Sequence, residues 1–238
     1  MTIWNRLGEL TASMASGARA GIAAIVEAVK TAYAGDPELR RRVAFSVAMI
    51  ALSAKMAKSD GVVSQNEIHA FHEIFHVPRE EARNVTRLYD IAKADTAGFE
   101  AYAHQMAGLC GSGHRNCAML EDILDGLFHI AKADGVVHER EVGFLRRVAE
   151  IFGIEELHFE AILARHASGA ADPYKVLGVA RGEPFATIKA RYRKLVSENH
   201  PDRLIARGVP PEFVEIATAR VAAINAAFEV IERRFKPA

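Results

Sequence analysis

A ten-residue segment occurs twice in this chain and limits the folds that the chain can adopt. Residues 58–67 read Lys-Ser-Asp-Gly-Val-Val-Ser-Gln-Asn-Glu, and residues 132–141 read Lys-Ala-Asp-Gly-Val-Val-His-Glu-Arg-Glu. Six of the ten positions are identical, at an offset of 74 residues. Each copy follows an apolar segment of helical period and precedes another. Because two copies are too few for a solenoid, the repeat predicts two helix–turn–helix units packed in one bundle.

The rest of the chain also has a helical period, with no persuasive β alternation. Asp36-Pro37 and Asp172-Pro173 each combine an N-cap residue with proline at the first helical position, so a helix is expected to begin at each. The nearly apolar run Val43–Leu52 is too short to span a bilayer and predicts a central core helix. We therefore expect an all-α fold in three parts: a loose helical arm over 1–35, a duplicated helical bundle over 36–167 and a small helical domain over 172–238.

The charges argue against several classes of partner. The chain has 30 basic and 30 acidic residues, so no global field favours nucleic acid or a membrane surface. From Asp172 onward there are 12 Lys and Arg against 8 Asp and Glu, or +4, which leaves −4 for the remainder. This asymmetry indicates modules with different partners.

Two further features predict a cytoplasmic protein without a transmembrane segment. Cys110 and Cys117 are too few for a disulfide framework and indicate a reducing compartment. Residues 1–10 lack the pattern of a secretory signal, and the apolar run Gly21–Val26 is cut off by Arg19 and Glu27.

The segment after Asp172 predicts an antiparallel helical hairpin. Its first long helix must end near Asn199, because the residue before Pro201 is pushed out of the α region. Its second long helix has an apolar seam with steps of 4, 3, 4 and 3 residues. That seam consists of Ala217, Val221, Ile224, Phe228 and Ile231. We expect His200-Pro201-Asp202 in a rigid loop at the tip, presented to solvent beside a basic helix face.

This segment resembles the J-domain of DnaJ-type co-chaperones. The matching motifs are Asp-Pro-Tyr-Lys-Val-Leu-Gly at 172–178, Ile-x-x-x-Tyr-Arg-Lys-Leu at 188–195, His-Pro-Asp at 200–202 and Ile-x-x-x-Phe-Glu-Val-Ile at 224–231. The resemblance implies a non-enzymatic protein that binds a DnaK-type chaperone and stimulates its ATP hydrolysis. The residues that it assigns to binding are His200, Pro201 and Asp202, with Lys189, Arg193 and Lys194 as electrostatic support and Tyr192 as an aromatic contact.

The segment departs from the J-domain pattern at two places. The loop that starts at Arg203 ends in Gly208-Val-Pro-Pro211, and no fourth helix follows Ile231. The chain also lacks a Gly/Phe-rich linker and a zinc-binding cysteine region, so it differs from a general DnaJ.

The repeated module resembles the TerB-like domain, and its pairing with a J-domain resembles the DjlA-type co-chaperones, which usually carry an N-terminal membrane anchor. TerB-like domains are associated with divalent metal, which would nominate Asp60, Glu67, Asp134 and Glu141. A normal EF-hand loop is excluded, because Lys58 and Lys132 stand where that loop needs carboxylates.

A structural interpretation accounts for the same repeat. In that interpretation Gly61 and Gly135 end helices in a left-handed conformation, and Glu67 and Glu141 cap the helices that follow. No cofactor is then required. The resulting alternative function is a metal-responsive stress protein with a structural J-like end.

Two other patterns are weaker. His72-Glu73-x-x-His76 fits a zinc-protease motif, but Pro78 truncates the helix and no third ligand follows. Cys110, His114 and Cys117 offer three zinc ligands where a structural site needs four, and the fourth would have to be remote, such as His104. We therefore expect a co-chaperone with the bundle as a recruiting or sensing module.

Overall fold

The computed structural model describes residues 5–9, 22–59, 77–80, 82–95, 97–108, 117–132, 135–167 and 171–235. Helices make up its secondary structure and no strand occurs within these ranges, which confirms the all-α prediction. The N-terminal bundle contains α2 (Ile22–Ala32), α3 (Pro37–Ser59), α5 (Ala82–Ala94), α6 (Phe99–Ala107), α7 (Ala118–Ala131), α8 (Glu139–Ile151) and α9 (Glu156–His166). The C-terminal part contains α10 (Pro173–Leu177), α11 (Phe185–Glu198), α12 (Pro201–Ala206), the 3-10 turn η2 (Pro211–Phe213) and α13 (Val214–Phe235).

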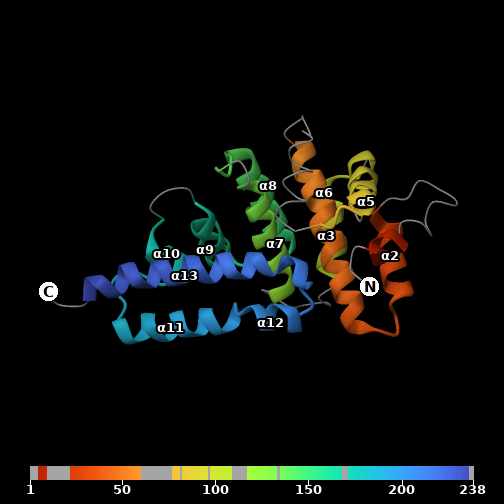
Figure 1. Cartoon of the computed structure of the whole chain (residues 1–238). Helices are drawn as coiled ribbons and strands as arrows, with labels where there is room; N and C mark the ends of the chain where they lie inside the picture. Colours follow the sequence, from red (N-terminus) through yellow and green to blue (C-terminus); the bar gives the residue numbers. More distant parts are fainter. Residues whose placement is uncertain are drawn as a thin grey trace.

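Helix α3 is the central element of the bundle, with α2, α5, α6 and α7 packed around it (Figure 1). All ten residues from Val43 to Leu52 are buried, which confirms the predicted core helix. A helix that is apolar on every side is stable only when neighbours cover it completely. The helix begins where Asp36-Pro37 predicts, because the Asp36 carboxylate accepts the backbone N–H of Leu39 at 2.9 Å. Among the described helices, none has the length and apolar character that crossing a membrane requires.

Helix α2 differs from the loose arm expected for residues 1–35. Its Ile25, Val26 and Val29 side chains are at most 4% exposed and belong to the bundle core. The alanine and glycine content suggested weak packing, but these three residues form an apolar face that α3 and α6 cover.

The C-terminal part is the predicted hairpin. Helices α11 and α13 run side by side in opposite directions, and α10 lies across α13 (Figure 1). Leu177, Ile188, Ile224 and Ile231 form the centre of a second apolar core, each with no exposed surface. Asp172 caps α10 by accepting the backbone N–H of Tyr174 at 3.1 Å, and α11 ends at Glu198 as predicted.

The tip of the hairpin is a helix where a loop was expected. Pro201 occupies the first position of α12 and His200 is its N-cap, so the proline begins a new helix as well as ending the previous one. Leu204 on α12 is 1% exposed and packs into the bundle core.

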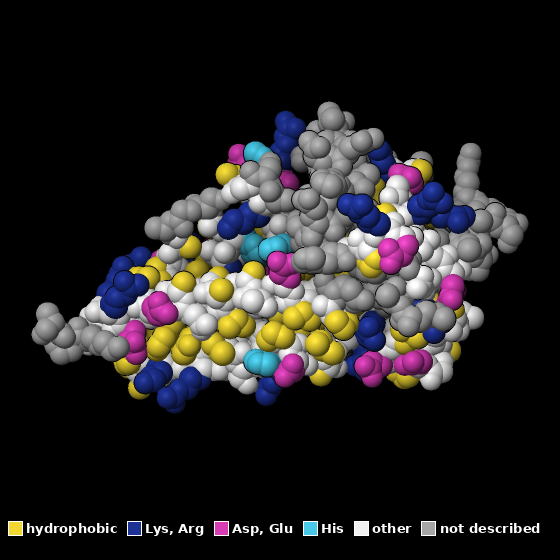
Figure 2. Space-filling view, viewed as in Figure 1, with side chains coloured by type: hydrophobic (Ala, Val, Ile, Leu, Met, Phe, Trp, Pro, Cys, Tyr) yellow, Lys and Arg dark blue, Asp and Glu magenta, His cyan; other side chains and the backbone are white. Residues whose placement is uncertain are grey.

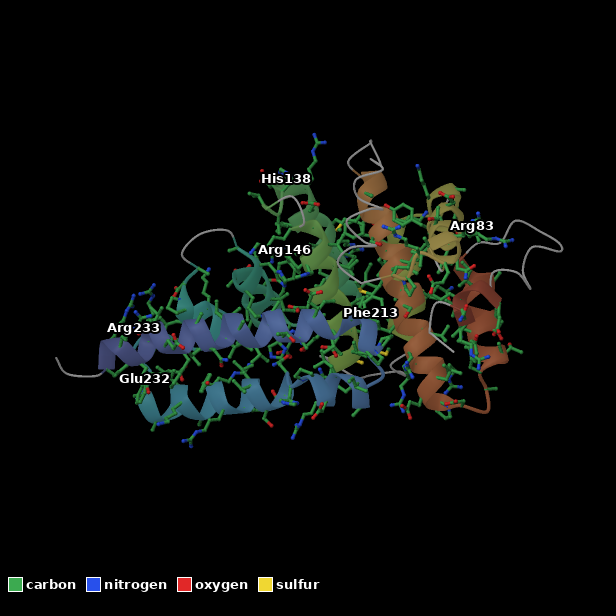
Figure 3. All side chains as sticks on the ribbon, viewed as in Figure 1. Arg83, His138, Arg146, Phe213, Glu232 and Arg233 are labelled. Atoms are coloured by element: carbon green, nitrogen blue, oxygen red, sulfur yellow. The ribbon has the colours of Figure 1, made fainter. Side chains whose placement is uncertain are left out.

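Helix α13 contributes to both cores, which the sequence analysis did not foresee. Ile216 and Ala217 at its beginning pack in the bundle core together with Phe213 of η2, whereas its later residues form the hairpin core. Phe213 lies where the start of α13 meets α3, with its ring edge-on to Phe45 at 5.1 Å between centroids (Figure 3). The hairpin is therefore built onto the bundle by a continuous helix.

We expect Gly208→Ala to destabilise this junction by about 1–3 kcal/mol. Gly208 has a φ of +98°, and an added Cβ would lie 2.7 Å from the Cβ of Arg41 on α3. Urea denaturation measures the cost. The matched control is Gly143→Ala on α8, where an added Cβ meets nothing and helix propensity predicts a gain of about 0.5–1 kcal/mol. Equal stability of the Gly208 variant and the wild type would contradict the packing described here.

Candidate functional site

The exposed tip of the hairpin is formed by His200, Pro201 and Asp202. The His200 and Asp202 side chains are 58% and 87% exposed. The imidazole Nδ1 of His200 accepts the backbone N–H of Asp202 at 3.3 Å, which orients the ring over the start of α12. In the neutral imidazole this bond places the proton on Nε2. The tip therefore offers a neighbouring protein an oriented N–H donor and, in Asp202, an acidic acceptor.

Helix α11 presents a basic face next to this tip. Arg193 and Lys194 are exposed and Lys189 is half-buried. The space-filling view shows Lys and Arg side chains on the outer side of α11, below an apolar band along the α11–α13 seam (Figure 2). Such a face suits an acidic partner surface.

Tyr192 serves the hairpin's own packing. Its ring stacks on Phe228 at 4.0 Å and 7°, and its hydroxyl donates to Asn225 Oδ1 at 3.1 Å. The side chain is half-buried, so only part of its ring is open to a partner.

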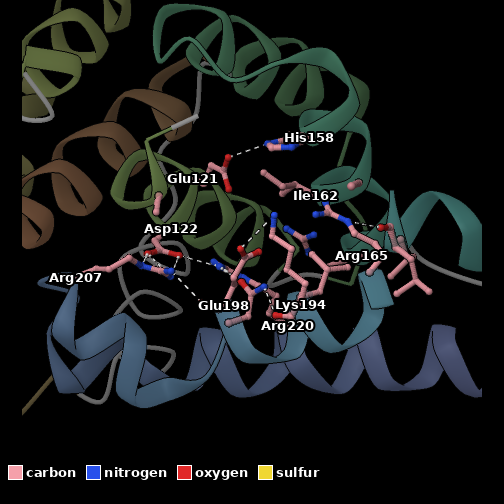
Figure 4. Close-up of a pocket in the computed structure, with 16 residues that line it drawn as sticks. Glu121, Asp122, His158, Ile162, Arg165, Lys194, Glu198, Arg207 and Arg220 are labelled. Atoms are coloured by element: carbon pink, nitrogen blue, oxygen red, sulfur yellow. Dashed lines mark hydrogen bonds and ion pairs between the residues drawn. The ribbon is translucent and has the colours of Figure 1, made fainter. Parts of the chain in front are cut away.

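A buried ion network fixes the tip against the bundle. Asp122 and Asp125 project from α7 with side chains only 2% exposed. Arg220 of α13 donates to Asp122 at 2.8 Å, and Arg207 at the end of α12 donates to both oxygens of Asp122 at 3.1 Å (Figure 4). Arg220 also donates to Asp125 at 2.9 Å. Arg220 also donates to Asn199 Oδ1 at 2.7 Å, directly before the tip. The position of His200 is thus tied to α7 by charge-assisted hydrogen bonds.

Neighbouring positive charges stabilise the ionised form of Asp125 in this network. Burial alone would raise the pKa of Asp125, but the charges of Arg220, Arg165 and His166 hold that pKa well below its usual range. Arg165 and His166, on α9, lie 3.2 Å from Asp125 Oδ1. The carboxylate is therefore ionised throughout the physiological range of pH.

Sequence reasoning missed this network. Its only local signal is a pair of aspartates three positions apart in the mostly apolar helix α7. Their partners Arg207 and Arg220 follow 85 to 98 residues later in the chain, and nothing in the local pattern identifies them.

Of the four nominated metal ligands, the structure describes Glu141. Asp60, Glu67 and Asp134 lie outside the described residues. Glu141 accepts the backbone N–H of His138 at 2.8 Å and so has the capping role of the structural interpretation. In the described part of the chain, no group of three metal-binding side chains comes together.

Gly135 has a positive φ, as expected, but it lies further from the helix end than predicted. Its φ is +103°, and its N–H closes a turn on the carbonyl of Lys132 at 2.8 Å. Helix α7 has already ended at Ala131, with Lys132 as its C-cap. Gly61 lies outside the described residues.

The two weaker patterns are largely outside the described residues as well, since His72, His76, Cys110 and His114 all fall there. His104 is exposed on α6. Cys117 is disulfide-bonded, contrary to the expectation of reduced thiols. A disulfide sulfur is not the thiolate that zinc requires, so Cys117 is not a zinc ligand in this structure.

Comparison with known proteins agrees with the two-part architecture. Residues 46–164 match the family described as tellurite resistance protein TerB, and residues 172–235 match the DnaJ domain. The co-chaperone protein DjlA of Photobacterium profundum is 29% identical, over 82% of this chain and 80% of its own. Its counterpart in Escherichia coli K12 is 27% identical with the same coverage, and that of Haemophilus influenzae is 31% identical over 51% of this chain and 55% of its own. No solved structure gives a significant match.

Proposed function

Since this chain belongs to the DjlA-type co-chaperones, in which a TerB domain precedes a J-domain, we propose that it binds a DnaK-type chaperone and stimulates that partner's ATP hydrolysis. The chain is accordingly a regulator of a chaperone rather than an enzyme. The observation that carries the proposal is the exposed, N-capping His200 beside the basic face of α11.

In this proposal each part of the tip has its own role. His200 donates a hydrogen bond from Nε2, and Asp202 accepts one from a basic group of the chaperone. Pro201 fixes the backbone between them, so little conformational entropy is lost when the tip binds. The interaction requires no metal or other cofactor.

Lys189, Arg193 and Lys194 attract the chaperone and orient it. Charges at the edge of an interface act mainly on the association rate, and salt screens their effect. Tyr192 adds part of one ring face to the contact.

The TerB domain is the recruiting or sensing module in this proposal. Because α13 belongs to both cores and the ion network joins α7 to the tip, whatever the TerB domain binds is held at a fixed orientation to the chaperone.

A charge-removal experiment tests the docking face. For Lys189→Gln/Arg193→Gln we expect the concentration that gives half-maximal stimulation of single-turnover ATP hydrolysis to rise about fivefold at low salt, as the loss of roughly 1 kcal/mol implies. At high salt the difference should shrink, because ions screen the wild-type attraction.

The control is Arg83→Gln/Arg87→Gln, which removes two exposed charges from α5 on the TerB domain. It should stimulate like the wild type. An equal loss in this control would show that net charge matters and the face of α11 does not. Absence of stimulation by the wild type would remove the proposed function itself.

A further inference from the structure

A cleft with a volume of about 320 Å³ lies between the TerB domain and the J-domain. Its walls come from α7 and α9 on one side and from α10, α11 and α13 on the other (Figure 4). Five of the side chains that line it are basic and three are acidic. The basic ones are Arg165, Arg191, Lys194, Arg207 and Arg220.

Each acidic side chain on the cleft wall already has a cationic or imidazole partner. Asp122 binds Arg207 and Arg220. Glu121 lies 3.0 Å from His158 Nδ1, and Glu198 lies 3.7 Å from Lys194 Nζ. The carboxylates are therefore committed within the protein.

The basic side chains on the wall outnumber the acidic ones. Arg165 Nε and Arg220 Nη2 have no hydrogen-bond partner among the described residues, but both atoms are fully buried, so a ligand in the cleft does not reach them. Arg191 donates its Nε to the carbonyl of Leu177 at 3.3 Å and makes no ion pair within the described ranges. Burial lowers the pKa of Arg165, and the charges of Asp125 and Glu121 do not offset this effect. Arg165, Lys194, Arg207 and Arg220 each have a carboxylate partner, so Arg191 is the one cation of the cleft wall for which the described residues supply none. An anion bound in the cleft would be that partner.

We propose that this cleft binds the phosphate group of a small molecule. Guanidinium groups match the oxygens of phosphate in paired hydrogen bonds, and the cleft has room for a phosphate with a small organic part. Arg165 belongs to the TerB domain and Arg191 to the J-domain, so the bound anion contacts both. The ligand thereby adds to the stability of the junction between the two domains.

Isothermal titration calorimetry and thermal unfolding test the proposal, with inorganic phosphate and glycerol 3-phosphate as probes and potassium chloride at matched ionic strength as the blank. Arg191→Gln should weaken phosphate binding about tenfold or more, which corresponds to the loss of one charge-assisted hydrogen bond. Because Arg191 is half-buried at the cleft edge, the variant should fold normally, and its unfolding temperature without phosphate checks this. Arg233→Gln, an exposed site on α13 outside the cleft, should bind like the wild type.

Either probe can support the site. Tighter binding of glycerol 3-phosphate would place the organic part inside the cleft, whereas equal binding would identify the phosphate group as the whole determinant. Equal affinities of Arg191→Gln and the wild type would overturn the proposal. The proposal would also be overturned if potassium chloride raised the unfolding temperature as much as phosphate does.

Discussion

Arg220→Met is expected to lower the free energy of unfolding by about 3–5 kcal/mol, the cost of breaking a buried ion pair from one side. Arg220 is 6% exposed and is the shared partner of Asp122 and Asp125. Methionine fills much of the same volume, so the loss comes mainly from the two carboxylates that remain buried with fewer cations. Arg207 and Arg165 compensate only part of that charge.

Urea denaturation measures the free energy of unfolding, and Arg233→Met on the exposed side of α13 is the matched control, with an expected change within about 0.5 kcal/mol.

Acid unfolding is a second, independent test of the network. A depressed Asp125 pKa contributes stability that is present above about pH 4 and is lost as pH falls through the folded-state value. Without Arg220 that pKa rises, so the variant should begin to unfold at a higher pH than the wild type. A variant as stable as the wild type, with the same acid midpoint, would show that the network does not hold the two domains together.

The sequence predicted the parts of the fold that rest on local physical rules. Asp36-Pro37 and Asp172-Pro173 begin α3 and α10 as capping chemistry requires, and α11 ends before His200-Pro201. The apolar run of α3 is the buried centre of the bundle because a helix without a polar face has no side to present to water.

These local rules do not predict how the two domains are joined. The period of α13 is continuous, so nothing in the sequence marks Ala217 as facing one core and Ile224 as facing the other. The partners of Asp122 and Asp125 include arginines that lie far away in the sequence, so the local pattern around the aspartates does not predict the network.

The candidate site was predicted in part. The motif predicted that His200-Pro201-Asp202 follows a basic helix. Its position at the tip of the hairpin explains why these residues are exposed. The sequence does not predict the helical state of residues 201–206, because a proline that ends one helix can be followed by a loop or can begin a new helix. The side-chain cap by His200 depends on the backbone at that junction, which only the structure supplies.

The junction also bears on how the co-chaperone would work. A J-domain on a flexible linker could reach a chaperone in many orientations. Here the buried arginines and the shared helix hold the tip in one orientation relative to the TerB domain. In this arrangement, the ligand of the TerB domain and the chaperone are expected to meet at a defined distance.

Replacing His200 with glutamine is expected to remove nearly all stimulation of the chaperone while leaving the fold intact. Glutamine cannot reproduce both the Nδ1 cap to Asp202 and the Nε2 donor in the same geometry. Because His200 is 58% exposed, the effect on stability should not exceed that of a lost N-cap, about 1 kcal/mol.

The measurement is single-turnover ATP hydrolysis by a DnaK-type chaperone with wild type, His200→Gln and His104→Gln added in parallel, the last being an exposed histidine on α6 remote from the tip. Circular dichroism and urea denaturation of the three proteins show that each is folded. The predicted result is full stimulation by the wild type and His104→Gln and nearly none by His200→Gln. Equal stimulation by a folded His200→Gln would contradict the assignment of the tip as the docking site.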